Sequence, residues 1–248
     1  MHISCSGHIP AGEYNDKISV SGSGKLDGNV RCTSLSCSGS VHGTGYVQCS
    51  EDVRVSGSCH IDGDLTANTI SASGSIHVNG DLTAVSTVRA SGALHCDGNV
   101  RGAAVHCSGS MHVEKGIEAE DFRMSGRIRC GGLLNAEKVD ISLDRAAGGA
   151  VGSIGGGEIR IYRKDSERSK KPRLPLLSRL MGGSGSGSGG LTVEEWIEGD
   201  TVALECVRAP KVVGRVVAVG ADCAIDLVQY SEECEIHPDA KVGRCEKV

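Results

Sequence analysis

Apolar and polar residues alternate in short runs from Gly22 to Ile141, and the pattern repeats every 17 or 18 residues. Apolar residues two apart form three pairs in each repeat, as in Val47 and Cys49 followed by Val53 and Val55. Alternation with a period of two predicts β-strands, so three pairs predict three short strands per repeat. A Ser-Gly pair marks each repeat, with its glycine at Gly22, Gly39, Gly57, Gly74, Gly92, Gly109 and Gly126.

Gly, Asn, Asp and Ser separate the apolar pairs and predict corners between the strands. We expect the corner glycines to adopt the positive φ that a sharp bend needs. A single repeat is too short to bury its own apolar face, so neighbouring repeats must stack. The sequence therefore predicts an all-β fold, a parallel three-sided β-helix solenoid with 17–18 residues per coil and about 4.8 Å between coils. The corner triplets are Asp27-Gly28-Asn29, Asp62-Gly63-Asp64, Asn79-Gly80-Asp81 and Asp97-Gly98-Asn99.

Cysteine is frequent, with 12 residues in the chain, but its positions do not suggest a metal framework. No C-x-x-C pair occurs, which argues against a zinc site built from thiolates. We interpret the repeat cysteines as small core residues and expect a reducing, cytoplasmic compartment. Seven of them fall on inward positions of the repeat, namely Cys32, Cys37, Cys49, Cys59, Cys96, Cys107 and Cys130.

Composition divides the 248 residues into three parts. We predict a β-helix core over 1–162, and a basic, then Gly/Ser-rich insertion or linker over 163–190. Residues 191–248 alternate again and predict further coils, with a separate small β domain as the alternative. The net charge of −5 argues against nucleic-acid binding. Residues 1–20 lack the features of a secretory signal, and no apolar stretch is long enough to span a membrane.

The first coil shows no polar cap in its sequence, and we expect it to present unpaired backbone groups. Such an end is a template for another chain, so polymer contacts are predicted at Ile3, Cys5 and Ile9. A second surface is predicted where basic residues accompany leucines, a composition that suits an anionic membrane. An ordinary linker packed on the solenoid is the alternative there. The predicted membrane contacts are Lys170, Lys171, Arg173, Leu174, Leu176, Leu177, Arg179, Leu180 and Met181.

Most repeats carry a histidine three residues after the repeat glycine, and these side chains should form an outward stripe. A carboxylate or amide follows two residues later in five repeats. A metal-binding array is one interpretation, and a charge-paired, solvated surface is the one we favour. Imidazolium groups about 4.8 Å apart repel by roughly 0.9 kcal/mol, so we expect stability to fall below about pH 6.5. The pH-sensitive stripe comprises His42, His60, His77, His95 and His112.

Enzyme chemistry has little support, because seven repeats without long insertions leave no cleft between coils. We expect no catalytic, cofactor-binding or metal-binding residues and no cofactor. The alternative function is a hexapeptide-type left-handed β-helix enzyme, an acyltransferase or a carbonic-anhydrase-like protein, acting as a trimer.

The run I-S-V-S-G-S-G-K-L-D-G-N-V-R-C (residues 18–32), echoed by S-G-S-I-H-V-N-G-D-L-T-A (residues 73–84), resembles the bactofilins. The Ile197-Glu-Gly-Asp segment and residues 217–230 resemble an extended C-terminal subgroup of that bacterial cytoskeletal family. The resemblance implies a right-handed β-helix that polymerises end to end without nucleotide and is not an enzyme. It also implies attachment to the inner membrane face and protein clients in cell shape or envelope organisation. The chain lacks the apolar-basic N-terminal peptide of many members.

Overall fold

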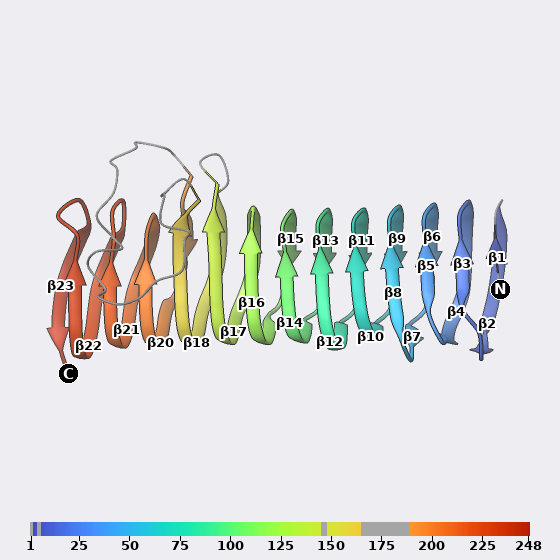
Figure 1. Ribbon diagram of the computed structural model, residues 1–248, viewed down its shortest axis with the longest axis horizontal. Helices are drawn as coiled ribbons and strands as arrows, with labels where there is room; N and C mark the ends of the chain where they lie inside the picture. The colour runs from blue at the N-terminus through green and yellow to red at the C-terminus, as the bar shows by residue number, and fades with distance from the viewer. Residues whose placement is uncertain (1, 4–5, 145–147, 165–188) are drawn as a thin grey trace. The chain divides into compact units, whose positions relative to one another are not determined.

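The computed structural model describes residues 2–3, 6–144, 148–164 and 189–248 (Figure 1). Every regular element among these residues is a β-strand, and the strands pair in parallel. The predicted all-β, parallel β-helix is therefore confirmed. Contacts divide the chain into two compact units, residues 1–120 and residues 121–248. The boundaries predicted at 162 and 190 stay predictions.

In the first unit, each strand pairs with the strand that follows it by one repeat. Leu65 faces Leu82, and Leu82 in turn faces Val100, so the same inward position forms a continuous apolar column. The strands are β1 (His2–Ile3), β2 (Gly7–Tyr14), β3 (Ile18–Val20), β4 (Ser23–Cys32), β5 (Leu35–Cys37), β6 (Ser40–Gly43), β7 (Val47–Cys49), β8 (Asp52–Val55), β9 (Ser58–Ile61), β10 (Leu65–Ala72), β11 (Ser75–Val78), β12 (Leu82–Ala90), β13 (Ala93–Cys96), β14 (Val100–Cys107) and β15 (Ser110–Val113). The next strand, β16 (Ile117–Ser125), contains the boundary between the units.

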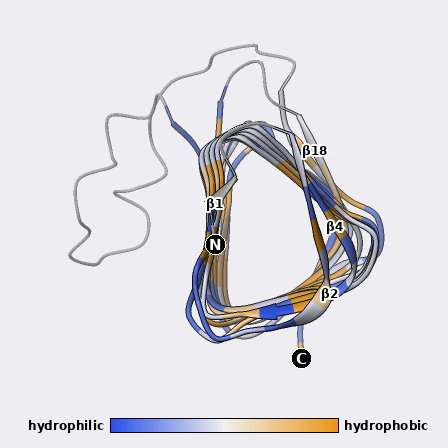
Figure 2. Ribbon diagram, turned by 90° about the vertical axis from the view of Figure 1, so that its right-hand side faces the viewer, coloured by the Kyte–Doolittle hydropathy of each residue, from blue (hydrophilic) through white to orange (hydrophobic). Residues whose placement is uncertain are grey.

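The interior of the unit is filled by both residues of each apolar pair, such as Ile76 and Val78. Leu65, Ile76 and Leu82 are completely buried, and polar residues lie between the buried positions. Figure 2 shows this alternation as apolar and polar colours along the strands, of which β2 and β4 are labelled. All seven repeat cysteines are buried, which confirms their interpretation as core residues.

The three short strands predicted for each coil are present as β6, β7 and β8. From β10 onward the second and third strands join into one longer strand, which differs from the prediction. The corner survives as a shift in register between Ala67 and Thr69, where β10 pairs with β12. The backbone therefore keeps pairing with the adjacent coil on both sides of the bend, and the pattern of side chains does not reveal this.

The corner glycines correct a prediction, because only Gly28 of the four adopts a positive φ, at 88°. At Gly80 and Gly98 the constraint is space. A Cβ at either position would lie 2.3 Å from a carboxylate oxygen of the preceding coil, on Asp64 or Asp81 respectively. The Asp64 carboxylate accepts a hydrogen bond from the Asp81 N–H at 2.8 Å, and Asp81 accepts one from the Asn99 N–H at 2.8 Å. Glycine is needed here so that a side chain can bind the backbone of the next coil.

The second unit has the same construction with longer strands. Its strands are β17 (Arg127–Leu143), β18 (Gly149–Arg163), β19 (Leu191–Val193), β20 (Trp196–Leu204), β21 (Val207–Val219), β22 (Ala224–Ile236) and β23 (Lys241–Lys247). Strand β18 pairs in parallel with β17 and also with β19 and β20, so Ile159 faces both Val139 and Val202. Strands on the two sides of residues 165–188 are thus hydrogen-bonded neighbours. None of the described residues belongs to a helix long and apolar enough to cross a lipid bilayer.

Candidate functional site

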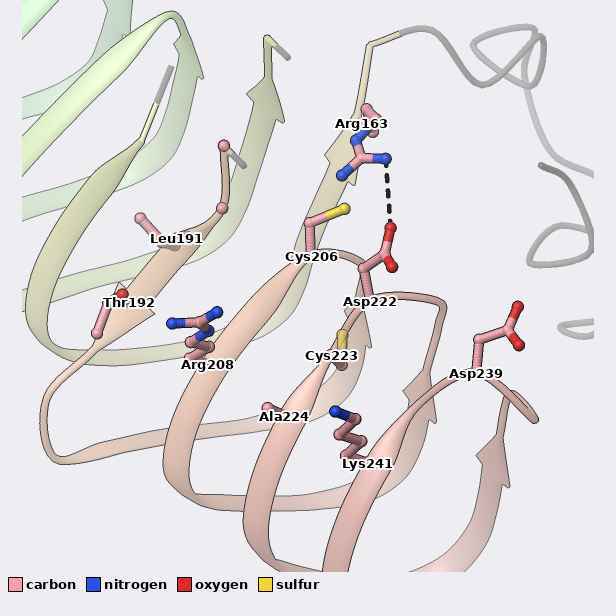
Figure 3. Close-up of a pocket in the computed structure, with 12 residues that line it drawn as sticks. Arg163, Leu191, Thr192, Cys206, Arg208, Asp222, Cys223, Ala224, Asp239 and Lys241 are labelled. Atoms are coloured by element: carbon pink, nitrogen blue, oxygen red, sulfur yellow. Dashed lines mark hydrogen bonds and ion pairs between the residues drawn. The ribbon is translucent and has the colours of Figure 1, made fainter. Parts of the chain in front are cut away.

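A pocket of about 430 Å³ lies in the second unit, where the ends of β18 and β19 meet the corners before β21 and β22. Its charged lining residues include Arg163, Arg208 and Asp222, and Arg163 Nη1 lies 3.3 Å from Asp222 Oδ2 (Figure 3). The pattern of residues along the chain does not reveal this pocket. Its lining residues come from successive coils and combine buried residues, such as Cys206 and Cys223, with charged ones that share no motif.

The thiols of this pocket are not suited to nucleophilic chemistry. Burial raises the pKa of Cys206 to about 11 and the pKa of Cys223 to about 12. Both thiols are therefore protonated near neutral pH, whereas the thiolate is the reactive form. The pocket offers charge and volume but no activated nucleophile.

The predicted stripe of histidines is assembled in the first unit on five strands, β6, β9, β11, β13 and β15. We call this set (His42, His60, His77, His95 and His112) the histidine ladder. Each ring pairs in register with the next, since His42 faces His60 and so on through to His112. The centroids of successive rings are 5.0, 4.6, 4.3 and 4.6 Å apart. The local reason is the strand period: each histidine stands between two inward residues, so its side chain must point outward.

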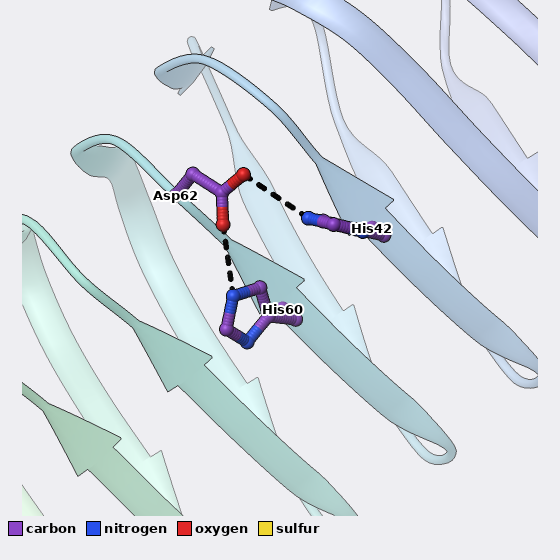
Figure 4. A group of neighbouring side chains, drawn as sticks. All are labelled: His42, His60 and Asp62. Carbon is purple, nitrogen blue, oxygen red and sulfur yellow. Dashed lines mark hydrogen bonds and ion pairs between the residues drawn. The ribbon is translucent and has the colours of Figure 1, made fainter.

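Carboxylates two residues after three of the histidines lie beside the ladder. Asp62 is placed between two rings, with Oδ2 3.1 Å from His42 Nε2 and Oδ1 2.9 Å from His60 Nε2 (Figure 4). Farther along, Asp97 Oδ1 lies 2.8 Å from His95 Nε2 and 3.7 Å from His77 Nε2. The hydrogen bonds from His42 and His60 lower the pKa of Asp62, so this carboxylate stays ionised to a lower pH than usual.

Glu114 continues the series, with Oε1 2.8 Å from His112 Nε2. In four of the five histidines, Nε2 therefore lies within hydrogen-bond distance of a carboxylate oxygen. The exception is His77, because Asn79 stands two residues after it and Asp97 of the next coil lies 3.7 Å from its Nε2, beyond hydrogen-bond distance.

His77 differs from the other members in its surroundings. Its Nε2 is shielded from solvent and has no hydrogen-bond partner among the described residues. Burial lowers the pKa of His77, and the neighbouring charges of His95 and His60 lower it further, while Asp97 opposes them. The sequence hints at this difference through Asn79, which stands where three other repeats of the ladder carry a carboxylate, but the shielding of Nε2 is visible only in the structure.

Lowering the pH below about 6.5, the ordinary pKa of histidine, should destabilise the first unit. The pKa of His77 is lowered in the folded chain, so the unfolded chain binds this proton at a higher pH. The stability that neutral His77 contributes is fully present above pH 6.5 and is lost as the pH falls through the lowered pKa of His77. We expect a loss of under about 1 kcal/mol, because 38% of the His77 side chain is exposed and solvent screens its charge.

Thermal denaturation between pH 8 and pH 5, in the presence of a metal chelator, measures this effect. The variant His77→Gln should lose less stability than the wild type over the same range. A wild-type melting temperature that does not change between the two pH values would contradict the prediction.

The predicted polymer contacts are only partly described. Ile9 lies in β2 and is completely buried, so its side chain packs inside the unit. The backbone of Ile3 pairs with Val20, while its side chain and all of Cys5 lie outside the described residues. The predicted membrane contacts, from Lys170 to Met181, also lie outside them. Both sets of contacts stay predictions.

Comparison with known proteins finds two families along the chain. Residues 2–83 match the Bactofilin family, described as polymer-forming cytoskeletal, which confirms over this segment the resemblance seen in the sequence. Residues 60–151 match FapA, the flagellar assembly protein A beta solenoid domain. The chain is 30% identical over 111 residues to YhbF, an uncharacterized protein of Bacillus subtilis. That alignment covers 45% of this chain and 40% of the relative, and no solved structure matches.

Proposed function

We propose that this protein, whose residues 2–83 form a bactofilin domain, is a structural scaffold that joins end to end with further copies of itself. The matched family is described as polymer-forming rather than by a reaction, which supports self-association over catalysis. We expect the assembly to need no nucleotide and to serve in cell shape or envelope organisation. Peripheral attachment to an anionic inner membrane surface through residues 170–181 is part of the same proposal.

The observation that carries the proposal is the open edge of β2. In the part of the chain that the structure describes, this strand pairs with β4 alone, from Gly7 facing Gly24 to Tyr14 facing Cys32. A parallel strand with one unpaired edge presents N–H and C=O groups in the spacing that another strand needs. Addition of a strand from a second copy would therefore continue the pairing that already joins coil to coil within the unit.

The same edge limits where a second copy can pair. Pro10 has no N–H to donate, and proline within sheets is confined to edges and bulges. The Tyr14 hydroxyl donates a 2.8 Å hydrogen bond to the Pro10 carbonyl. We therefore expect the partner strand to pair on either side of Pro10 rather than at it.

Purified protein should form filaments without nucleotide, and Ile3→Asp should shorten them because it places a charge in the first coil. Negative-stain electron microscopy and sedimentation measure filament length and mass. The control is Val85→Asp, which introduces the same charge at a residue that is 72% exposed on β12, away from the first coil. Discrete particles whose mass is constant across protein and salt concentrations would refute self-assembly. Equal shortening of the filaments by both variants would show that the polymer contact does not lie in the first coil.

A further inference from the structure

The histidine ladder brings together three sets of metal-ligand atoms that the sequence alone does not place. In each set, two imidazole nitrogens and one carboxylate oxygen all lie within 4.8 Å of one another. The sets are His42, His60 and Asp62; His77, His95 and Asp97; and His95, His112 and Glu114. Imidazole with carboxylate is a donor combination that suits Zn²⁺ and other late first-row divalent ions.

The carboxylate-to-nitrogen distances are close to those around a tetrahedral ion. Zinc bonds of about 2.0–2.2 Å to nitrogen and oxygen place neighbouring ligand atoms roughly 3.3 Å apart. In the first set Asp62 lies 3.1 and 2.9 Å from the two nitrogens, and in the second Asp97 lies 2.8 and 3.7 Å from them. These side chains lie on the outer face and are about one-third to one-half exposed, so small rotations can bring the donors into position.

His77 supplies an independent observation. Its Nε2 is shielded from solvent, has no hydrogen bond among the described residues and lies in the second set. A shielded polar atom without a hydrogen bond is costly and calls for an explanation. If the ladder were only a surface of hydrogen-bonded His–carboxylate pairs, this nitrogen of His77 would stay without a hydrogen bond. An ion held between His77, His95 and Asp97 would bind that nitrogen.

We propose that the histidine ladder binds Zn²⁺-type divalent ions, two per chain. One ion is held by His42, His60 and Asp62. The other is held by His77, His95 and Asp97, the set that contains the shielded nitrogen of His77. An ion there excludes a second one at His95, His112 and Glu114, because His95 belongs to both sets and offers one ligand atom. Three protein ligands leave a fourth position open to water. This binding is separate from filament assembly and does not depend on it.

Titration of full-length protein with Zn²⁺ against a chromophoric chelator measures the stoichiometry. The wild type should bind two ions, and His95→Gln should bind one, since this change removes a ligand from two sets. The double variant His60→Gln/His95→Gln should bind none on the ladder. The matched control is His8→Gln, which should still bind two. His8 is also bonded to a carboxylate, with Nδ1 2.9 Å from Asp27 Oδ2, but it pairs with Lys25 instead of another histidine.

Thiols are the competing ligands, and the experiment must separate them. Cys245 is exposed, and its sulfur lies 3.6 Å from that of Cys234. Co²⁺ in place of Zn²⁺ distinguishes the donors, because thiolate ligands give a strong near-ultraviolet charge-transfer band and nitrogen and oxygen ligands do not. We expect no such band in the wild type, and an unchanged Co²⁺ spectrum in Cys245→Ser.

Three results would overturn the proposal. The double variant could keep two ions of wild-type affinity, the thiolate band could appear and vanish in Cys245→Ser, or zinc could bind every variant equally and only at millimolar concentration. Because the substituted side chains are partly exposed, the variants should fold, and matching circular dichroism spectra would establish this.

Discussion

Gly74→Ala should destabilise the first unit by about 3 kcal/mol or more. A Cβ on Gly74 would lie 2.0 Å from the carbonyl oxygen of Gly57 and 2.5 Å from that of Ser56. Both atoms belong to the backbone of the preceding coil, so no side-chain rotation can relieve the overlap. The Gly57 carbonyl also accepts a 2.9 Å hydrogen bond from the Ser75 N–H, and separating the coils would break this bond.

Denaturant unfolding monitored by circular dichroism would measure the loss, and Gly102→Ala is the matched control. The nearest atoms to a Cβ on Gly102 are 3.5 Å away, which is ordinary van der Waals contact. This replacement should be neutral or stabilise the unit by up to about 1 kcal/mol, because alanine reduces the freedom of the unfolded chain. Similar unfolding midpoints for the two variants would show that the coils are not packed as closely as described.

Leu134→Ala should lower the free energy of unfolding by about 2–5 kcal/mol. The Leu134 side chain is completely buried in β17 and pairs with the buried Ile154 of β18. Truncation removes its apolar contacts and leaves a cavity that the rigid coils cannot fill. Its neighbour Leu133 points to the opposite face and is 41% exposed, so Leu133→Ala should change the stability by no more than about 0.5 kcal/mol.

The two adjacent leucines make this a direct test of the strand period in the second unit. Thermal or denaturant unfolding of both variants gives the comparison. A larger loss in Leu133→Ala than in Leu134→Ala would mean that the inward and outward faces have been exchanged, since a shift of one residue reverses every side chain of a strand. An equal loss in the two would contradict the assignment of one inward and one outward leucine.

The repeat and its inward positions could be predicted from the sequence because the constraint on them is local and periodic. A strand that is buried on one side requires an apolar residue at every second position, and Ile76 and Val78 show this around His77. The strand boundaries were harder to predict from the sequence. The joining of two short strands into β10 depends on hydrogen bonds to the adjacent coils, and the order of apolar and polar residues does not encode it.

The glycines show the same limit. Gly28 and Gly80 occupy equivalent corners and look alike in the sequence, yet only Gly28 has a positive φ. Glycine is required at position 80 because the Asp64 side chain of the preceding coil occupies the space that a Cβ would need. The sequence likewise located the histidine ladder, and Asn79 marks a repeat that lacks the carboxylate. The shielding of His77 Nε2 and its 3.7 Å distance from Asp97 are visible only in the structure.

The register between coils has a consequence for how such a chain can change in length. Leu65 meets Leu82 in the same way that Leu82 meets Val100, whether the intervening repeat has 17 or 18 residues, since the corners absorb the difference. Duplication of one whole repeat in the gene would therefore leave the neighbours of every existing interior residue nearly the same in kind. The protein could grow or shrink in fixed increments of one layer, whereas insertion of a single residue within a strand would exchange the two faces of the part that follows it.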